Sequence, residues 1–427
     1  MPPLASARTF TPGPLRGALD VPGDKSISHR ALILGAFADA LIEIRNLNPG
    51  RDVRATLEAL IALGASVEGN GSTVRVRGGR LREPMGAIDC MNSGSTARML
   101  LGVCAGADVR ARFDGDASLR RRPMEPVAAQ LRAFGAKIET TDGTLPLLID
   151  GTPQIETRRF ILITPSAQIK SALLLAGLFA RVPVTILGDK RSRDHTERLL
   201  RYLGAEIAWD GMRVELLAGP TRRDPIDVAG DFSAAGFFIT AATIAPGSAC
   251  EIRGVGVNPT RTGLLDALLQ MGADIELRNA REVAGEPVAD IVVRHAPLRG
   301  VTLGPDVALR AIDEIPLLAV AAAFAAGETK ITGVRELRSK ESDRVAAIER
   351  LMAAVGIEVE AAPNGLTIRG GTPRGEGASV DTHDDHRIAM ATAVLAAGAG
   401  PLAIDSDASI DVSFPAFLDT LRSVQHA

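Results

Sequence analysis

A nine-residue phrase recurs five times along the chain and constrains the fold more than any other feature. Each copy reads as the end of an amphipathic helix, a glycine, and the start of a strand with alternating apolar residues. The copies occupy residues 60–68, 131–139, 200–208, 268–276 and 352–360. Their glycines stand where a helix end favours a residue that tolerates positive φ: Gly64, Gly135, Gly204, Gly272 and Gly356. Their spacings of 71, 69, 68 and 84 residues predict a repeat architecture of strands and helices.

Three of the predicted strands lead into residue pairs that are typical of hairpin turns. These pairs are Asp142-Gly143, Asp210-Gly211 and Asn364-Gly365. We therefore expect a hairpin at each of these three copies, and the first copy has Gly69-Asn70-Gly71 at the same place.

The two ends of the chain each carry part of a repeat unit. Residues 417–424 start like the repeat helix, and residues 15–21 read as a strand with no helix before it. We expect both ends to complete one unit, so that one domain is entered, left and re-entered near residues 20–23 and 228–231. Six units then divide into two domains of three, residues 1–20 plus 230–427 and residues 21–229. The alternative is one open solenoid, which leaves the strand at residues 15–21 unexplained.

Composition narrows the class of protein. The chain has 427 residues and a net charge of −3, and only 3% of its residues are aromatic, so neither a basic surface nor base-stacking platforms for nucleic acid are expected. No apolar run approaches the roughly 18 residues of a membrane span. Residues 1–10 lack a signal-peptide core, and Cys90, Cys104 and Cys250 fit buried thiols in a reducing compartment. We expect a cytoplasmic protein.

In the first half of the chain, small hydroxyl residues or glycine stand beside cations at expected helix starts. The four segments are residues 23–30 (GDKSISHR), 91–98 (MNSGSTAR), 164–171 (TPSAQIKS) and 192–197 (SRDHTE), and residues 116–123 (DASLRRRP) add three arginines. We expect Ser26 or Ser28 to cap a helix over residues 31–38. One such segment is as consistent with a capped surface helix as with an anion site. Four of them indicate helix N-termini that converge on a polyanionic ligand.

The second half of the chain carries a different mixture, in which carboxylates alternate with cations before apolar helices. It occurs at residues 313–314, 340–344 (KESDR) and 383–387 (HDDHR). This is the combination that proton transfer beside a bound anion requires. A charge-paired surface helix start is the alternative for residues 340–344. His383 and His386 without a third histidine or cysteine nearby are a weak metal motif, and we expect no metal and no cofactor.

Together these segments resemble the 5-enolpyruvylshikimate-3-phosphate synthase family of enolpyruvyl transferases. The resemblance covers nearly the whole chain and includes nine motifs in order: GDKSISHR, NSGST, the RRP arginine, SAQIKSALLLAGL, SRDHTERLL, IDEIP, RSKESDR, DDHRIAMA and SFPAF. It implies an α/β (α+β) fold, a two-domain inside-out α/β barrel of six βαβαββ repeats with three in each domain. The chain of such a fold crosses twice between the domains, as the repeats also predict.

The resemblance implies transfer of the enolpyruvyl group of phosphoenolpyruvate to the 5-hydroxyl of shikimate-3-phosphate, with release of phosphate. This is the sixth step of the shikimate pathway toward chorismate, an addition followed by an elimination in an interdomain cleft. The implied partners are these two small molecules, with no nucleic acid and no membrane, and the chain is expected to be a monomer. The domains are expected to close on shikimate-3-phosphate.

The resemblance also assigns site residues. The shikimate-3-phosphate set is Lys25, Ser26, Arg30, Ser166, Ala167, Gln168, Arg193, Asp313 and Lys340. The phosphoenolpyruvate set is Lys25, Gly94, Arg122, Gln168, Arg344 and Arg387. The implied catalytic residues are Asp313 as base, Glu341 as acid, and Lys25. Several cations suit two phosphates and two carboxylates in one site. An acid near pH 7 needs a raised pKa, which neighbouring cations oppose, so the sequence leaves the role of Glu341 open.

The chain departs from the family pattern at two positions. Val412 stands where some members have a lysine, so one contact with phosphoenolpyruvate is absent or replaced, and Glu336 stands where others have an asparagine. The related transferase that acts on UDP-N-acetylglucosamine uses a cysteine in the loop at residues 114–121, which contains none here. A non-catalytic clamp for nucleic acid is a further alternative, and the acidic net charge argues against it.

Gly94 is a glycine where some herbicide-tolerant members of the family have alanine. We therefore predict that glyphosate enters the site and inhibits the reaction. Inhibition of phosphate release, measured at several phosphoenolpyruvate concentrations, checks this prediction. Inhibition no tighter than millimolar would contradict it.

Overall fold

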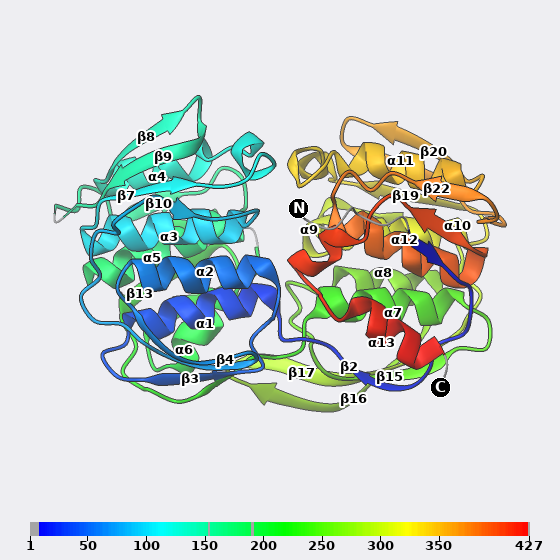
Figure 1. Cartoon of the computed structure of the whole chain (residues 1–427), viewed down its shortest axis with the longest axis horizontal. Coiled ribbons are helices and arrows are strands. Elements are labelled where there is room, and N and C mark those ends of the chain that lie inside the picture. The colour runs from blue at the N-terminus through cyan, green and yellow to red at the C-terminus, as the bar shows by residue number, and fades with distance from the viewer. Residues whose placement is uncertain (1–7, 153, 189–191, 426–427) are drawn as a thin grey trace. The chain divides into compact units, whose positions relative to one another are not determined.

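The structure is a computed structural model that describes residues 8–152, 154–188 and 192–425. Its contacts divide the chain into two compact units, and Figure 1 labels many of their elements. Unit 1 consists of Met1–Pro22, Gly230–Arg281 and Pro287–Ala427, and unit 2 consists of Gly23–Ala229 and Glu282–Glu286. The predicted domain bounds differ from these units at Val21 and Pro22, and at the short segment Glu282–Glu286. No helix of the described residues is long and apolar enough to cross a membrane.

Unit 2 contains three four-stranded sheets with one topology. In each sheet the first two strands are parallel, and the last two strands form an antiparallel hairpin. The first sheet is β14 (Ile226–Asp227), β3 (Ile42–Arg45), β5 (Thr73–Arg77) and β4 (Ser66–Asn70). The second is β6 (Ile88–Asp89), β7 (Ala111–Asp114), β9 (Thr144–Asp150) and β8 (Lys137–Thr141). The third is β10 (Arg159–Ile161), β11 (Val184–Leu187), β13 (Arg213–Ala218) and β12 (Glu206–Trp209).

Two helices accompany each sheet of unit 2, one before and one after the second strand. They are α1 (Lys25–Phe37), α2 (Arg51–Ala62), α3 (Gly94–Ala107), α4 (Glu125–Phe134), α5 (Ala167–Ala180) and α6 (His195–Tyr202), with a short 3₁₀ helix η1 (Leu119–Arg121). The second and third repeats follow the βαβαββ order along the chain, whereas the first repeat takes its first strand, β14, from the end of this segment.

Unit 1 repeats the same strand order in two sheets, and its third sheet has three strands within the described residues. The sheets are β2 (Arg16–Asp20), β15 (Ala249–Gly256), β17 (Glu286–Arg294) and β16 (Asp274–Val283); β18 (Thr302–Leu303), β19 (Glu328–Thr332), β21 (Gly365–Arg369) and β20 (Glu358–Ala362); and β22 (Ala378–Val380), β23 (Leu402–Ile404) and β1 (Arg8–Phe10). The helices are α7 (Phe232–Ile244), α8 (Gly263–Met271), α9 (Pro305–Arg310), α10 (Ile315–Ala323), α11 (Arg344–Ala354), α12 (His386–Ala399) and α13 (Phe417–Gln425), with η2 (Arg335–Ser339) and η3 (Ala408–Val412).

The repeat features read from the sequence are present in the structure. All five repeat glycines have positive φ, between 75° at Gly356 and 126° at Gly135. The three predicted hairpins are the antiparallel pairs β8–β9, β12–β13 and β20–β21. Both predictions are confirmed.

The two chain ends meet in a way that the sequence analysis did not predict. β1 pairs antiparallel with β23 and completes the last repeat, with Phe10 opposite Leu402. The expected strand at residues 15–21 is β2, which lies instead parallel to β15 in the fourth repeat. The assignment of residues 15–21 to the same repeat as the C-terminal helix was therefore wrong. Three-residue β1 carries too little periodicity to be recognised.

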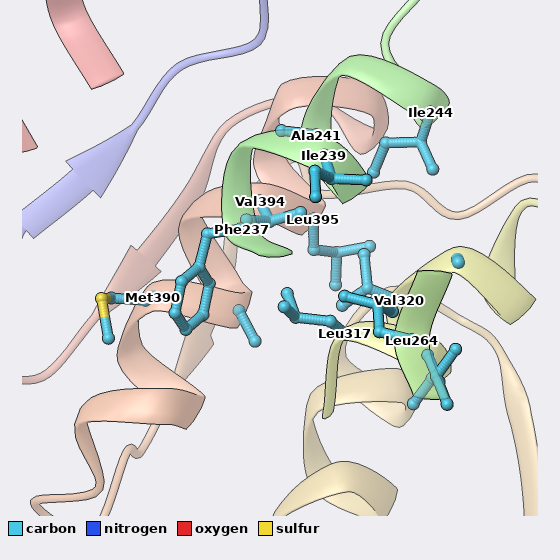
Figure 2. Packing of buried hydrophobic residues seen from close by; sticks show 14 of the residues in the cluster. Phe237, Ile239, Ala241, Ile244, Leu264, Leu317, Val320, Met390, Val394 and Leu395 are labelled. Carbon is cyan, nitrogen blue, oxygen red and sulfur yellow. The ribbon is translucent and has the colours of Figure 1, made fainter. Parts of the chain in front are cut away.

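The helices at the centre of unit 1 are buried on all sides. Every residue of α7 from Phe232 to Ile244 is buried, and α7, α10 and α12 pack on one another. Figure 2 shows Phe237 of α7, Leu317 and Val320 of α10, and Met390 of α12 in this core. Helices that are apolar all round are typical of such buried positions. Their polar N-terminal ends are the places where functional groups can concentrate.

The central contact of unit 2 is the close approach of α3 to α5, which Figure 1 shows running side by side. A Cβ atom at Gly102 would lie 2.1 Å from the carbonyl oxygen of Ala172, and one at Gly106 would lie 2.0 Å from that of Ala176. Only glycine allows the two helix backbones to approach this closely.

We predict that Gly102→Ala destabilises the protein by about 2 kcal/mol, because the added methyl group must push α3 away from α5. Urea unfolding followed by circular dichroism measures the change. Gly86→Ala is the matched control, since nothing lies within 4 Å of the added Cβ. Equal stabilities of the two variants would show that the close approach does not matter.

Candidate active site

The start of α1 supplies the first group of predicted residues. Asp24 caps the helix, and its side chain accepts a hydrogen bond of 2.9 Å from the backbone N–H of Ile27. Ser26 and Ser28 lie inside the first turns, so the prediction that one of them caps the helix was wrong. The helix begins at Lys25 rather than near residue 31, because an aspartate directly before it serves as the cap. Lys25, Ser26 and Arg30 therefore share the N-terminal end of one helix.

Arg30 joins three helices of unit 2. Its Nε donates to Thr196 Oγ1 at 2.7 Å on α6, and its Nη2 donates to Ser171 Oγ at 2.8 Å on α5. Its Nη1 donates to the carbonyl oxygen of Ser26 at 2.8 Å. Burial lowers the pKa of Arg30 to about 10, although Glu197 and Asp24 oppose the shift, and the charge of nearby Arg193 adds to it. The group still carries its charge at neutral pH.

Lys25 and Asp52 link α1 to α2 and α3. Lys25 Nζ lies 2.7 Å from Asp52 Oδ2, and the backbone oxygen of Asp52 accepts from Thr96 Oγ1 at 3.3 Å. Ser93 caps α3. The sequence analysis did not identify Asp52, which lies in none of the motifs described above. An acid in the first turn of a helix was the only available signal.

Gln168 links the starts of α3 and α5. Its Oε1 accepts from Arg98 Nη1 at 2.8 Å, and its Nε2 donates to Ser95 Oγ at 3.0 Å. A Cβ atom at Gly94 would lie 2.6 Å from Arg98 Nη1 and 3.5 Å from Arg122 Nη1. Gly94, Arg122 and Gln168 are therefore neighbours.

The remaining predicted residues of unit 2 adjoin these helix starts. Ser166 caps α5, Ala167 is its first residue, and Arg193 directly precedes the first turn of α6. Arg122 Nη2 donates to Asn92 Oδ1, just before α3. Unit 2 thus gathers nine predicted residues at the starts of α1, α3, α5 and α6. These nine are Lys25, Ser26, Arg30, Gly94, Arg122, Ser166, Ala167, Gln168 and Arg193.

A buried ion pair and a buried contact between a histidine and a carboxylate, both in unit 2, were not predicted from the sequence. Lys170 Nζ lies 2.7 Å from Glu197 Oε1, and both side chains are fully buried. His195 Nδ1 lies 2.8 Å from Glu286 Oε1, although 91 residues separate the two in the sequence. No local pattern in the sequence connects His195 with the tip of the β16–β17 hairpin.

Arg344 is the centre of a second cluster, in unit 1. Its side chain is 1% exposed, and its Nε and Nη2 donate to the two oxygens of Asp385 at 2.8 and 3.2 Å. Nη2 also donates to Glu341 Oε2 at 2.6 Å, and Nη1 lies 3.6 Å from Asp313 Oδ1. Burial opposes the charge of Arg344, but these carboxylates outweigh burial and raise its pKa.

Arg387 lies beside Asp313 in the same cluster. Its Nη1 donates to the backbone oxygen of Asp313 at 3.1 Å, and its Nη2 lies 4.0 Å from Asp313 Oδ2. Asp313, Glu341, Arg344 and Arg387 are therefore brought together. Lys340 Nζ lies 2.6 Å from Glu336 Oε1. Glu336, one of the two departures from the family pattern, therefore pairs with a lysine that is predicted to bind shikimate-3-phosphate. Val412, the other departure, ends η3.

The cysteines and the other residue types that can bind metals form no reactive or metal-binding group within the described residues. All three cysteines are buried, and burial raises the pKa of Cys104 and of Cys250 to about 12. Such thiols stay protonated near neutral pH, which confirms their predicted place in the core rather than as nucleophiles. Across the described ranges, no group of three or more His, Cys, Asp or Glu side chains has the arrangement of a metal site.

Asp385 has two structural duties, since it caps α12 through the backbone N–H of Arg387 and binds Arg344. We predict that Asp385→Asn destabilises the protein by about 3 kcal/mol, because it leaves a buried guanidinium without its main counter-ion. Urea unfolding measures the loss. Asp419→Asn, which removes one partner of an exposed pair with Arg422, is the control and should change the free energy of unfolding by no more than about 0.5 kcal/mol.

The same substitution has a defined pH signature. Burial opposes ionisation of Asp385, but Arg344 outweighs it and holds the pKa of Asp385 below the ordinary 3.8. The stability that a lowered pKa contributes is complete above 3.8 and is lost as the pH falls through the folded value. The free energy of unfolding should therefore fall less steeply below this pH in Asp385→Asn than in the wild type. Parallel pH profiles would contradict the assignment.

Comparisons with known proteins agree with this geometry. The sequence model of the family described as EPSP synthase (3-phosphoshikimate 1-carboxyvinyltransferase) matches residues 10–421. The chain is 46% identical over 414 residues to 3-phosphoshikimate 1-carboxyvinyltransferase of Anaeromyxobacter sp. (strain Fw109-5), covering 96% of each chain. It is 47% identical over 435 residues to that of Gloeobacter violaceus, covering 99% of this chain and 100% of the relative.

Solved structures agree as well. EPSP synthase from Acinetobacter baumannii superimposes with a TM-score of 0.86 at 36% identity over 98% of each chain. The enolpyruvyl transferase NikO from Streptomyces tendae has a TM-score of 0.80 at 19% identity, covering 99% of this chain and 98% of NikO, which shows a shared fold. The predicted two-domain α/β fold class is confirmed, and the UDP-N-acetylglucosamine alternative is not favoured. The chain belongs to the EPSP synthase (3-phosphoshikimate 1-carboxyvinyltransferase) family of transferases.

Proposed function

We propose that this protein transfers the enolpyruvyl group of phosphoenolpyruvate to the 5-hydroxyl of shikimate-3-phosphate and releases phosphate. The observation that carries the proposal is the cluster of Asp313, Glu341, Arg344 and Arg387, in which two guanidinium groups flank a carboxylate. This arrangement suits a reaction that moves protons next to an anionic substrate. Family membership supports the same reaction.

Unit 2 would supply most of the binding of shikimate-3-phosphate. Lys25, Arg30 and Arg193 bring three cations to the starts of α1 and α6, where the helix dipole also favours anions. Ser26, Ser166, Ala167 and Gln168 add short polar side chains and helix-start backbone. From unit 1, Asp313 and Lys340 complete the proposed set, and binding by Lys340 requires that it exchange its partner Glu336 for the substrate.

Phosphoenolpyruvate would be held by guanidinium groups. Arg344 and Arg387 in unit 1 and Arg122 in unit 2 each present planar donors that match carboxylate and phosphate oxygens. Gln168 and Lys25 would contact both substrates. Gly94 lies beside Arg98 and Arg122, where a larger residue would displace a guanidinium. The proposal requires the two units to act on the same substrates, and we take them as the two domains of the enzyme, which close on shikimate-3-phosphate.

The chemistry would proceed in two steps. In the addition, Asp313 accepts the proton of the 5-hydroxyl, the hydroxyl oxygen bonds to C2 of phosphoenolpyruvate, and the methylene carbon C3 takes a proton from Glu341. In the elimination the roles reverse: C3 returns its proton to Glu341, the double bond re-forms, and the C2–O bond breaks as the leaving phosphate takes the proton held by Asp313. Arg344 donates to Glu341 at 2.6 Å and favours its ionised form. Glu341 can therefore act as an acid only after the substrate anions engage Arg344.

The other expectations from the sequence stay predictions. They are the cytoplasmic location, the monomeric state, and the absence of a cofactor, a metal and a nucleic-acid partner.

An assay of phosphate release tests the proposed function. The wild type should release phosphate only when both substrates are present. Asp313→Ala should lower kcat by about 10²-fold or more, since it removes the proposed base. Lys25→Ala should raise both KM values, since it removes a cation that contacts both substrates.

Matched controls are available on the surface of unit 1. Asp419→Ala and Lys330→Ala each remove one partner of an exposed ion pair and should leave the rate unchanged. Turnover of UDP-N-acetylglucosamine in place of shikimate-3-phosphate, or no phosphate release by the wild type, would overturn the proposal.

A further inference from the structure

Ser233, near the start of α7, contacts three charged side chains in the interior of unit 1. Its residue is 5% exposed. Its Oγ lies 2.6 Å from Arg261 Nη2 and 3.1 Å from Arg387 Nη1, and it also contacts Glu314 Oε1. A hydroxyl has one proton to donate and two lone pairs to accept with, and a guanidinium only donates. Ser233 therefore accepts from both arginines, and its only proton goes to Glu314.

Glu314 is the shared counter-ion of these two arginines. Its side chain is fully buried, and Oε1 lies 3.1 Å from Arg261 Nη1 and 3.5 Å from Arg387 Nη1. Oε1 receives the Ser233 hydroxyl as well, while Oε2 has no hydrogen-bond partner within the described part of the chain. Both arginines therefore meet Glu314 at the same oxygen, which also receives the serine hydroxyl.

Arg261 is itself fixed in place. Its side chain is 3% exposed, and its Nη2 lies 3.4 Å from Asp231 Oδ1, the carboxylate that caps α7. Arg261 therefore connects Ser233 and Glu314 to the carboxylate that caps α7. Ser233 and Glu314, which Arg261 holds in place, also contact Arg387 and can fix its position.

Arg387 receives its protein contacts mainly on one nitrogen. Nη1 donates to Ser233 Oγ and to the backbone oxygen of Asp313, both at 3.1 Å. Nη2 lies 4.0 Å from Asp313 Oδ2, beyond hydrogen-bond distance. With Nη1 held, the plane of the guanidinium is fixed and Nη2 can donate to a ligand. This preorganisation is what a bidentate contact with a planar carboxylate needs.

We propose that Ser233 and Glu314 are positioning residues that orient Arg387 for binding phosphoenolpyruvate. The inference rests on the proposed function. Without the Ser233 hydroxyl, Arg387 Nη1 loses one of its two acceptors, and without the charge of Glu314, Arg261 and Arg387 lose their shared counter-ion. In both cases the guanidinium is free to rotate away from the substrate.

Steady-state kinetics of Ser233→Ala and Glu314→Gln test the inference. Each variant should raise KM for phosphoenolpyruvate by about tenfold, the effect of losing one oriented, charge-assisted hydrogen bond. KM for shikimate-3-phosphate should rise less than KM for phosphoenolpyruvate, because Arg387 hydrogen-bonds the backbone oxygen of Asp313 and not the carboxylate that is assigned to shikimate-3-phosphate. A merely structural role would not separate the two KM values.

Two matched controls measure the effect of disturbing a buried polar group elsewhere in unit 1. Ser248→Ala removes a hydroxyl that is also 5% exposed and accepts from the backbone of Leu15. Asp290→Asn neutralises a buried carboxylate that pairs with Arg281. Both controls should keep wild-type KM values. If they raise KM for phosphoenolpyruvate as much as the test variants do, the inference fails.

A double-mutant cycle separates positioning from a direct effect. In an Arg387→Ala background, Ser233→Ala should cause no further rise in KM for phosphoenolpyruvate, because the group that it positions is gone. An additive rise would overturn the inference. If Glu314→Gln does not fold, as judged by circular dichroism, Ser233→Ala and the cycle decide, since these variants leave the carboxylate of Glu314 paired with Arg261.

The wild-type assay keeps the two proposals distinct. No phosphate release by the wild type would refute the proposed function. An active wild type together with an unchanged KM for phosphoenolpyruvate in Ser233→Ala would refute the positioning role alone.

Discussion

The burial of guanidinium groups against helix-capping carboxylates is the constraint on which the candidate site depends. Arg344 is the first residue of α11, and Asp385, its main counter-ion, caps α12. One carboxylate therefore fixes the start of one helix and the side chain of another. Removing a charge from water costs several kcal/mol, so these groups are stable only in this geometry. The same principle recurs where Asp231 caps α7 and approaches Arg261.

The βαβαββ repeat explains why such helix ends gather. Parallel strands in each repeat require a helix that runs back between them, so successive repeats place equivalent helix starts at equivalent positions. In unit 2 the starts of α1, α3, α5 and α6 are joined by Arg30 and Gln168. In unit 1 the starts of α7, α11 and α12 are joined by hydrogen bonds of Ser233, Arg344 and Arg387.

The two clusters differ in their balance of charge, and this difference supports the division of roles proposed above. The unit 2 cluster is rich in cations, which suits the holding of phosphate and carboxylate groups. In unit 1, Asp313, Glu341 and Asp385 surround the single guanidinium of Arg344. Excess carboxylate next to fixed cations supplies sites that can take up and return protons.

The sequence by itself determined the repeat unit, its glycine-terminated helices, its hairpins and the family. These features depend on local periodicity and on motifs of contiguous residues, which can be recognised without knowledge of the fold. It also located the helix starts that carry the candidate residues, including Arg122 and Arg387. It placed the start of α1 too late, because Asp24 was not recognised as the cap.

Only the tertiary structure decided which distant groups are partners. Glu314 and Ser233 are 81 residues apart, and β1 pairs with β23 across almost the whole chain. No spacing rule links such residues, because their contact results from the packing of whole helices and sheets. The structure therefore revealed Asp52, Arg261, Ser233 and Glu286 as parts of charged networks. Burial makes these pairings selective, since an ionised group removed from water needs a particular partner at a particular place.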